Sequence, residues 1–354
     1  MAVIINMLSK AESVKGQGVL SAYEEQVRLV RETLPEGWKV RINSRKKADI
    51  YHVHTVNPQY FIRMLCKPKD AVSVGYVHFL PETMDKSLKL PWIARKVFYA
   101  YIIRMYKLMD HLVVVNPCFI PKLEKYGICR EKVTFIPNFV SDKNFYPAQP
   151  EEKRALRRKY GLPEEGTVVL SVGQLQKRKG VMEFLELAEK MPDKTFAWAG
   201  GFSFGRISDG YEKIKKAMEN PPENVRFLGL VDRSEMNGIY QMADMLFQPS
   251  FDELFPMTIL EAMCCGLPLV LRDLELYRAI LDGCYLAGDS TPDFEKALRG
   301  LEDPAAYAQA QSRSLEGHAY YSRERVADMW RDYYRMVLEG RKTKKTKKRR
   351  KANA

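Results

Sequence analysis

Two glutamates, Glu253 and Glu261, are spaced so that they could bind one ligand. The predicted strand Met245–Gln248 ends just before a loop that carries Glu253, and Glu261 lies in the next predicted helix, Thr258–Cys265. Pro256 suits the first position of that helix, because its φ is fixed and its missing N–H would be unpaired there. Ligands bind at the carboxyl ends of strands in open α/β sheets, and carboxylates accept several hydrogen bonds. The pattern favours a hydroxyl-rich ligand, although such glutamates can also simply be solvated.

A basic turn between two glycines follows an earlier predicted strand. Strand Val168–Val172 runs into Gly173, and the cations Lys177–Lys179 precede Gly180, where the next predicted helix begins. A glycine turn, a cation cluster and a helix start together make an anion site. Lysine, as a point charge, suits a phosphate group. Without the glycines, the three cations would be interpreted as a solvated charge run.

These residues depend on strands and helices that alternate along the whole chain. Such alternation indicates parallel sheets with helices on both faces. The predicted strands are Val3–Met7, Val40–Ile42, Ile50–Val53, Val72–Val77, His111–Val115, Val133–Pro137, Val168–Val172, Phe196–Ala199, Val225–Phe227, Met245–Gln248 and Leu269–Leu271. The predicted helices include Ser21–Leu34, Trp92–Met109, Val181–Met191, Arg233–Met242, Thr258–Cys265 and Tyr320–Leu338.

A polar, proline-bearing segment, Asp142–Pro150, interrupts the series and suits a linker. We therefore expect two Rossmann-like, doubly wound α/β domains, at residues 1–145 and 150–318. A helix over residues 319–340 should return to the N-terminal domain. Residues 341–354 should form a disordered polybasic tail.

The net charge of +13 is concentrated in that tail, where nine Lys or Arg residues and no acid leave +4 for the rest of the chain. Such a run binds polyanions, either an anionic lipid surface or nucleic acid. The N-terminus lacks the charge and apolar pattern of a signal peptide, and no segment reaches the roughly 18 uncharged apolar residues of a spanning helix. We expect a cytoplasmic protein that meets membranes only from the surface.

The two motifs resemble those of the retaining GT-B glycosyltransferases of family four. The family pattern V-G-R-L-x-x-x-K-G is similar to Val172–Gly180, and S-x-x-E-x-F-x-x-x-x-L-E-A-M-x-x-G-x-P-V is similar to Ser250–Val270. The resemblance covers roughly residues 3–335 and implies two Rossmann-like domains facing across a cleft. It also implies retaining, metal-independent transfer from a nucleotide sugar, usually UDP-linked. The family's arginine after the first glycine is Gln174 here, and the sequence leaves open whether Arg178 or Lys177 supplies the missing charge.

The resemblance implies a role for individual residues. Lys179 would balance the charge of the leaving diphosphate, Glu253 would bind sugar hydroxyls near the reacting carbon, and Glu261 would bind the ribose diol. His78 would hydrogen-bond near the transferred sugar, with a buried structural histidine as the alternative. Donor contacts are expected at Gly16, Gly18, Gly173, Gln174, Arg178, Phe255, Met257, Thr258 and Glu261. We expect no metal site, and no cofactor apart from the UDP-sugar donor substrate.

A basic and aromatic stretch, Lys86–Lys107, contains six Lys or Arg residues, five aromatic residues and no acid. A helical wheel puts its cations on one stripe and its aromatic residues on the adjoining one. This arrangement suits an anionic lipid interface. The alternative is a helix packed on its sheet with a solvated basic edge. We expect membrane binding by Trp92, Lys96, Tyr99, Arg104 and Lys107.

Within the family, three segments resemble the bacterial glycolipid synthases that add a second hexose to monoglucosyl-diacylglycerol. The segments are NMLSKAESVKGQGVLSAYEEQ, GYVHFLPETM and VGQLQKRKGV. The resemblance implies transfer of galactose or glucose from a UDP-sugar to that glycolipid, at the inner face of the cell membrane. A soluble or polyprenyl-linked glycan acceptor is the alternative. Nucleic acid is not an expected partner, because a nucleic-acid-binding function would leave Glu253, Glu261 and Lys179 unexplained.

Overall fold

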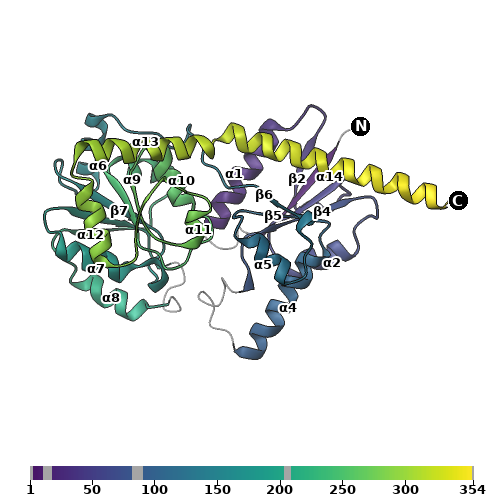
Figure 1. Cartoon of the computed structure of the whole chain (residues 1–354), viewed down its shortest axis with the longest axis horizontal. Helices are drawn as coiled ribbons and strands as arrows, with labels where there is room; N and C mark the ends of the chain where they lie inside the picture. The colour runs from purple at the N-terminus through teal and green to yellow at the C-terminus, as the bar shows by residue number, and fades with distance from the viewer. Residues whose placement is uncertain (1–2, 11–17, 82–90, 203–208, 353–354) are drawn as a thin grey trace. The chain divides into compact units, whose positions relative to one another are not determined.

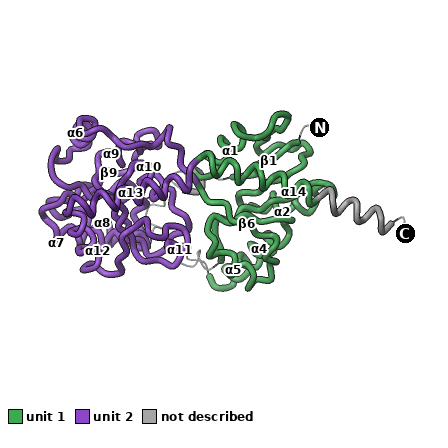
Figure 2. Tube along the Cα trace, turned by 45° about the horizontal axis from the view of Figure 1, so that its top comes forward, with its two compact units in different colours: residues 1–138, 323–354 green, residues 139–322 purple. Residues whose placement is uncertain are grey.

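A computed structural model describes residues 3–10, 18–81, 91–202 and 209–352, without the side chains of residues 18–21 and 341–352. The chain divides into two compact units (Figure 2). Unit 1 consists of Met1–Asn138 and Arg323–Ala354, and unit 2 consists of Phe139–Ser322. Each unit contains one parallel six-stranded sheet.

The sheet of unit 1 has the strand order β2-β1-β3-β4-β5-β6. Its strands are β1 (Ile4–Leu8), β2 (Lys39–Ile42), β3 (Ile50–Val53), β4 (Val72–Val77), β5 (His111–Val114) and β6 (Val133–Phe135). Helices α1 (Gly18–Thr33) and α14 (Arg323–Ala352) cover one face. Helices α2 (Pro58–Leu65), α4 (Trp92–Leu108) and α5 (Phe119–Lys125) lie on the other (Figure 1). Cover on both faces explains why β3 and β4 are buried along their whole length.

The sheet of unit 2 has the order β12-β11-β10-β7-β8-β9. Its strands are β7 (Val168–Val172), β8 (Thr195–Ala199), β9 (Val225–Gly229), β10 (Met245–Gln248), β11 (Leu269–Arg272) and β12 (Leu286–Gly288). On one face lie α7 (Val181–Lys190), α8 (Tyr211–Glu219) and α12 (Thr291–Gly300) (Figure 1). On the other lie α6 (Pro150–Lys159), α9 (Met236–Gln241), α10 (Met257–Cys264) and α13 (Pro304–Tyr320). The short helix α11 (Glu275–Arg278) follows β11.

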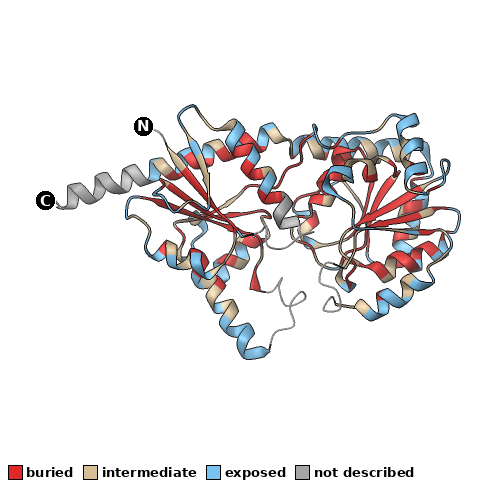
Figure 3. Ribbon diagram, turned by 180° about the vertical axis from the view of Figure 1, so that it is seen from behind, coloured by how far each residue is buried: buried red, intermediate tan, exposed pale blue. Residues whose placement is uncertain are grey.

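The core of unit 2 lies between its sheet and α7, where large aromatic side chains interlock. Phe184 of α7 meets Phe196 and Trp198 of β8 edge to face, with ring centroids 5.5 and 5.1 Å apart. All three are fully buried, and Figure 3 shows the strands as the most buried part of each unit. This rigid sheet fixes the positions of the loops at its carboxyl edge.

The prediction of two doubly wound parallel-sheet domains is confirmed, and the differences are local. Strand β12 was not predicted, since a three-residue edge strand has too short an apolar pattern to be recognised. The helix predicted over Tyr320–Leu338 starts at Arg323 instead, because α13 occupies the chain up to Tyr320. The backbone of α14 continues to Ala352, so residues 341–352 differ from the disordered tail expected from their charge. Lys and Arg have good helix propensity, and neither Gly nor Pro follows Gly340.

Candidate active site

Gly180 lets the basic turn of unit 2 pack against the loop that follows β10, and Gly173 packs against Gly200, which follows β8. Gly180 has φ +76°, and a Cβ there would lie 2.5 Å from the carbonyl oxygen of Pro249. Gly173, at the end of β7, packs so closely on Gly200 that a Cβ on Gly200 would lie 1.9 Å from the Gly173 oxygen. A backbone hydrogen bond of 2.7 Å from Phe251 N–H to the carbonyl of Arg178 joins the two segments. The two sequence motifs, Val172–Gly180 and Ser250–Val270, therefore meet at the carboxyl edge of the sheet, although they are far apart in the sequence.

Lys179 and Glu253 form a buried ion pair at this edge. Glu253 lies in the loop that follows β10, and the Oε1 atom of Glu253 accepts a hydrogen bond from Lys179 Nζ. Only 11% of the Lys179 side chain and 6% of the Glu253 side chain are exposed. Burial alone would raise the pKa of Glu253, but the charges of Lys179 and Arg178 hold it below its usual value. The site thus keeps a cation and an anion side by side, out of bulk water.

Arg178 is the second cation held at the site. Its Nε donates to Gln176 Oε1 at 2.9 Å, and its Nη1 donates to the Asp252 carbonyl at 3.2 Å. Lys177, in contrast, is exposed, and its backbone N–H bonds to the Asp209 carbonyl. Arg178 therefore lies against the loop of Glu253, where its charge acts on both members of the ion pair.

Arg272, which the sequence analysis missed, holds the loop that precedes Glu253. Its Nε donates to the Pro249 carbonyl at 3.0 Å and its Nη1 to the Asp289 carbonyl at 2.7 Å. Its guanidinium also lies 3.9 Å from the ring centroid of Phe251. The available signal was an arginine that ends the otherwise apolar run Leu269–Arg272.

Glu261 lies in α10 with only 2% of the residue exposed. Its Oε1 accepts from Arg233 Nη1, and its Oε2 accepts from the hydroxyl of Tyr240 at 2.6 Å. Pro256 stands one position earlier than predicted, as the residue before the helix, and α10 begins at Met257. The expected donor contacts at the start of α10 are buried or half-buried, and they are Phe255, Met257 and Thr258. Arg233 and Tyr240 were not identified from the sequence, which does not show that they meet Glu261.

The expected site residues of unit 1 have a different, uncharged setting. His78 follows β4, is 5% exposed, and its Nε2 has no hydrogen-bond partner among the described residues. Burial lowers the pKa of His78 to about 3. The expected glycine loop is only partly described: Gly18 is the first residue of α1, and Gly16 lies outside the described residues.

Helix α4 divides into an exposed first half and a packed second half. Trp92 is 63% exposed, and Lys96 Nζ lies 5.0 Å from its ring centroid. Arg104 and Lys107 are exposed, and Tyr99 is half-buried. Tyr106, which a helical wheel puts on the aromatic stripe, is buried and donates to the Phe79 carbonyl at 2.9 Å. That part of the wheel interpretation is wrong, because the second half of α4 packs on unit 1 while the first half stands clear of it (Figure 3).

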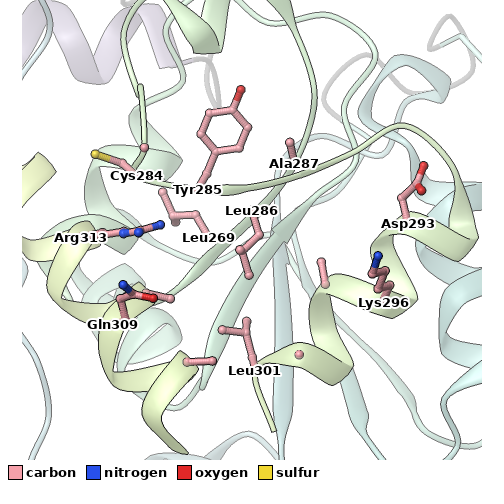
Figure 4. A pocket seen from close by; sticks show the side chains of 15 residues that line it. Leu269, Cys284, Tyr285, Leu286, Ala287, Asp293, Lys296, Leu301, Gln309 and Arg313 are labelled. Atoms are coloured by element: carbon pink, nitrogen blue, oxygen red, sulfur yellow. The ribbon is translucent and has the colours of Figure 1, made fainter. Parts of the chain in front are cut away.

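A cavity of about 420 Å³ opens elsewhere in unit 2, between β11, β12, α12 and α13 (Figure 4). Apolar side chains such as Leu286 and Leu301 form its wall, and Lys296 and Arg313 also line it. None of the residues expected to bind the donor or to act in catalysis is among its lining residues. The cavity is therefore separate from the candidate active site.

Comparison with known proteins decides the family. The family model described as "Glycosyl transferases group 1" matches residues 152–282, and "Glycosyltransferase Family 4" matches residues 24–144. The alpha-galactosylglucosyldiacylglycerol synthase of Streptococcus pneumoniae is 44% identical over 340 residues, covering 96% of this chain and 91% of that protein. The chain is a family-four glycosyltransferase. The resemblance inferred from the motifs is thereby confirmed.

More distant relatives of this glycosyltransferase agree with the assignment. The processive diacylglycerol alpha-glucosyltransferase of Acholeplasma laidlawii is 26% identical over 318 residues, covering 87% of this chain and 92% of that protein. Sucrose-phosphate synthase from Thermosynechococcus elongatus has a TM-score of 0.77 at 17% identity, covering 96% of this chain and all of that structure. Anabaena Alr3699/HepE in complex with UDP-glucose has a TM-score of 0.75 at 12% identity, covering 94% and 99%. The structural likeness supports the GT-B fold.

Within the described part of this glycosyltransferase, no helix is long and apolar enough to cross a membrane. In the same part of the chain, no three His, Cys, Asp or Glu side chains are grouped so that they could hold a metal ion.

Proposed function

We propose that this glycosyltransferase transfers galactose or glucose from a UDP-sugar to monoglucosyl-diacylglycerol, with retention of the anomeric configuration. The product would be a diglycosyl-diacylglycerol. The observation that carries the proposal is the buried Lys179–Glu253 pair, at the strand edge where ligands bind in α/β sheets. The chemical names of the two glycolipid-synthesising relatives supply the acceptor class.

The proposed chemistry breaks the bond between the anomeric carbon and a β-phosphate oxygen of UDP and makes a bond from that carbon to a hydroxyl oxygen of the acceptor, whose proton passes to the leaving phosphate. The leaving UDP gains negative charge, which Lys179 and Arg178 would stabilise from preorganised positions. Arg178, rather than Lys177, would replace the family's arginine at Gln174, because it is anchored to the Asp252 carbonyl while Lys177 faces solvent. Glu253 would then accept hydrogen bonds from hydroxyls of the sugar.

The other contacts to the donor would be those that the family resemblance implies. Glu261 would bind the ribose diol, and His78, as a neutral imidazole, would bind near the transferred sugar. The amides of Met257 and Thr258 come before the first hydrogen bond of α10, from Ile259 N–H to the Pro256 carbonyl, and would face the diphosphate. The remaining donor contacts would be Gly16, Gly18, Gly173, Gln174, Phe255, Met257 and Thr258.

The acceptor is a lipid, so the enzyme would bind the anionic inner face of the cell membrane. The exposed first half of α4 supports this proposal, because Trp92, Ile93 and Val97 are each about 60% exposed beside exposed cations. Apolar side chains next to Lys and Arg are suited to the boundary between lipid headgroups and acyl chains. The contacts would be Trp92, Lys96, Tyr99, Arg104 and Lys107, with Ile93 and Val97 added from the structure.

The test offers purified enzyme both UDP-galactose and UDP-glucose with two acceptors. The acceptors are monoglucosyl-diacylglycerol in vesicles that contain anionic phospholipid, and a soluble α-glucoside. We expect the glycolipid to receive one hexose with an α linkage, as seen by mass spectrometry and NMR, and the soluble glucoside to react much more slowly. Equal rates on both acceptors would replace the lipid proposal by the soluble-glycan alternative. Absence of transfer from either UDP-sugar would contradict the donor proposal.

A further inference from the structure

Both carboxylate oxygens of Glu261 already have a protein partner. Arg233, in the short 3₁₀ segment Arg233–Glu235 after β9, donates to Oε1. Tyr240, in α9, donates to Oε2 at 2.6 Å. Two elements other than its own helix therefore fix one glutamate, which is itself almost fully buried.

Arg233 is itself held in place, although 40% of its side chain is exposed. Its guanidinium lies 4.9 Å from the ring centroid of Phe145, and Phe145 meets Tyr240 edge to face with centroids 5.8 Å apart. Burial, followed by the charge of Glu261, raises the pKa of Tyr240 well above its usual value, so the phenol keeps its proton and donates it. The four side chains form one packed cluster with the carboxylate at its centre.

The lone-pair positions of the Glu261 carboxylate determine how many more hydrogen bonds this cluster can accept from a ligand. An ionised carboxylate has about four lone-pair positions, and Arg233 and Tyr240 use one on each oxygen. Among the described residues, one position therefore remains on each oxygen, and the two positions have a fixed orientation. Two hydroxyls on adjacent carbons present two donors with a matching separation, as in a ribose diol.

We propose that Arg233 and Tyr240 are positioning residues that orient the Glu261 carboxylate toward the ribose diol of the donor nucleotide. This inference rests on the proposed function, which gives Glu261 the ribose. Neither residue needs to touch the reacting atoms. Loss of Arg233 leaves Glu261 in place but frees its carboxylate to rotate, so the effect should fall on donor binding and not on turnover.

The experiment compares a UDP-sugar with its 2′-deoxyuridine analogue as donors, in the full-length enzyme. The variants are R233M, R233K, Y240F and E261A, and the matched control is R226M. Arg226 is an exposed arginine of β9 whose side chain donates to nearby backbone carbonyls, those of Glu223 and Val225. Thermal unfolding of each variant shows whether it is folded.

The wild type should prefer the ribose donor over its 2′-deoxy analogue in kcat/KM, and E261A should lose that preference. R233M should raise KM for the UDP-sugar about tenfold with little change in kcat, and it should leave KM for the deoxy donor almost unchanged. R233K should restore part of the preference, Y240F should weaken it, and R226M should behave as the wild type.

Three results would overturn the inference. R233M could keep the full ribose preference, or it could change KM equally for both donors. It could also lower KM for the UDP-sugar, which would show that Arg233 competes with the ribose for the Glu261 carboxylate. If E261A loses the preference and R233M does not, the positioning role alone fails. If the wild type itself shows no ribose preference, the role of Glu261 in the proposed function fails as well.

Discussion

The two units bury ionisable groups in opposite ways. In unit 2, the buried charges are paired, Lys179 with Glu253 and Arg233 with Glu261. In unit 1, three buried histidines, His52, His54 and His78, are stacked among aromatic rings, and burial lowers the pKa of each. Pairing retains charge inside the protein, whereas unpaired burial makes a group neutral.

The difference indicates what each unit is prepared to bind. The paired charges of unit 2 can be shared with an incoming diphosphate without new desolvation of the protein. The neutral imidazoles of unit 1 can donate a hydrogen bond to a hydroxyl group or accept one from it. They offer no positive charge to a phosphate. The ring stack extends to α14, where Tyr334 lies 2.8 Å from His52 Nδ1 and Trp330 stacks near Tyr76. This neutral cluster therefore also fixes the last helix on the sheet of unit 1.

The largest expected effect comes from breaking the charge pair of unit 2. K179M or E253Q should each lower kcat by about 10²–10³, as for loss of one preorganised charged contact. Each should also destabilise the fold by about 3–5 kcal/mol, because the other charge stays buried without its partner. The double variant K179M/E253Q should recover stability but not activity. Steady-state kinetics and urea unfolding measure the two effects separately.

The matched control for this prediction is K159M, which breaks an exposed pair of unit 2. Lys159 and Glu235 are 53% and 45% exposed, so the stability of the fold should change little, with normal turnover. Near-normal kcat in both K179M and E253Q would contradict the site assignment.

The second expected effect is a loss of stability of unit 1 in acid. The pKa of His52 and of His78 is about 3 in the folded protein and about 6.5 in the unfolded chain. Since the unfolded state takes up protons first, stability is complete above pH 6.5 and falls as the pH drops toward 3. At pH 5 the loss should be about 2 kcal/mol for each of the two histidines. Urea unfolding at pH 7.5 and pH 5 measures it.

Hydrogen exchange can locate that acid effect. Amides of β3 and β4 should lose protection between pH 7.5 and pH 5, after correction for the intrinsic exchange rate, while those of β7 and β10 should change little. H54F should reduce the pH dependence, since both ring nitrogens of His54 lack a hydrogen-bond partner among the described residues and phenylalanine loses no bond there. Equal losses in both units would contradict the contrast between them.

The sequence predicted the charged site better than the neutral one, for physical reasons. Gly173, Gly180, Lys179 and Glu253 stand at strand ends within two short segments, so a local pattern locates them. Arg233 meets Glu261 from a 3₁₀ segment that lies 28 residues earlier in the chain, and only the folded sheet brings them together. The stack around His54 likewise joins strands and helices that are distant in sequence. The sequence predicted a strand at Ile50–Val53 but could not show which rings would meet.

Helix α4 shows a second limit of sequence patterns. The wheel separates faces of a helix, but it does not show where along its length the helix leaves the body of the protein. Trp92 and Tyr106 share the wheel's aromatic stripe, yet one is 63% exposed and the other is buried. Ile93 and Val97 were missed for the same reason, since an apolar residue in a helix is normally assigned to the core.

The third expected effect concerns the exposed first half of α4 in unit 1, where apolar side chains stand beside exposed cations. Replacing Trp92 and Val97 by Ser should weaken binding to anionic vesicles about tenfold or more, since each side chain would lose apolar burial in the lipid. The loss should persist at high salt, because apolar insertion is not screened. M336S, which changes an exposed apolar residue of α14, is the control. Unchanged vesicle sedimentation of the double variant would remove α4 from the membrane proposal.

The smallest expected effect is that of metal removal, and it tests whether unit 2 supplies the whole countercharge of the leaving diphosphate. Lys179 and Arg178 are two cations anchored beside the same loop, and the start of α10 adds helix amides. If these groups suffice, EDTA should change kcat less than twofold, and added Mg²⁺ or Mn²⁺ should not restore K179M. A loss of activity in EDTA that Mn²⁺ reverses would show that the protein cations carry only part of the charge. Rescue of K179M by a divalent ion would show that Lys179 acts as a replaceable point charge, which would separate its role from that of its partner Glu253.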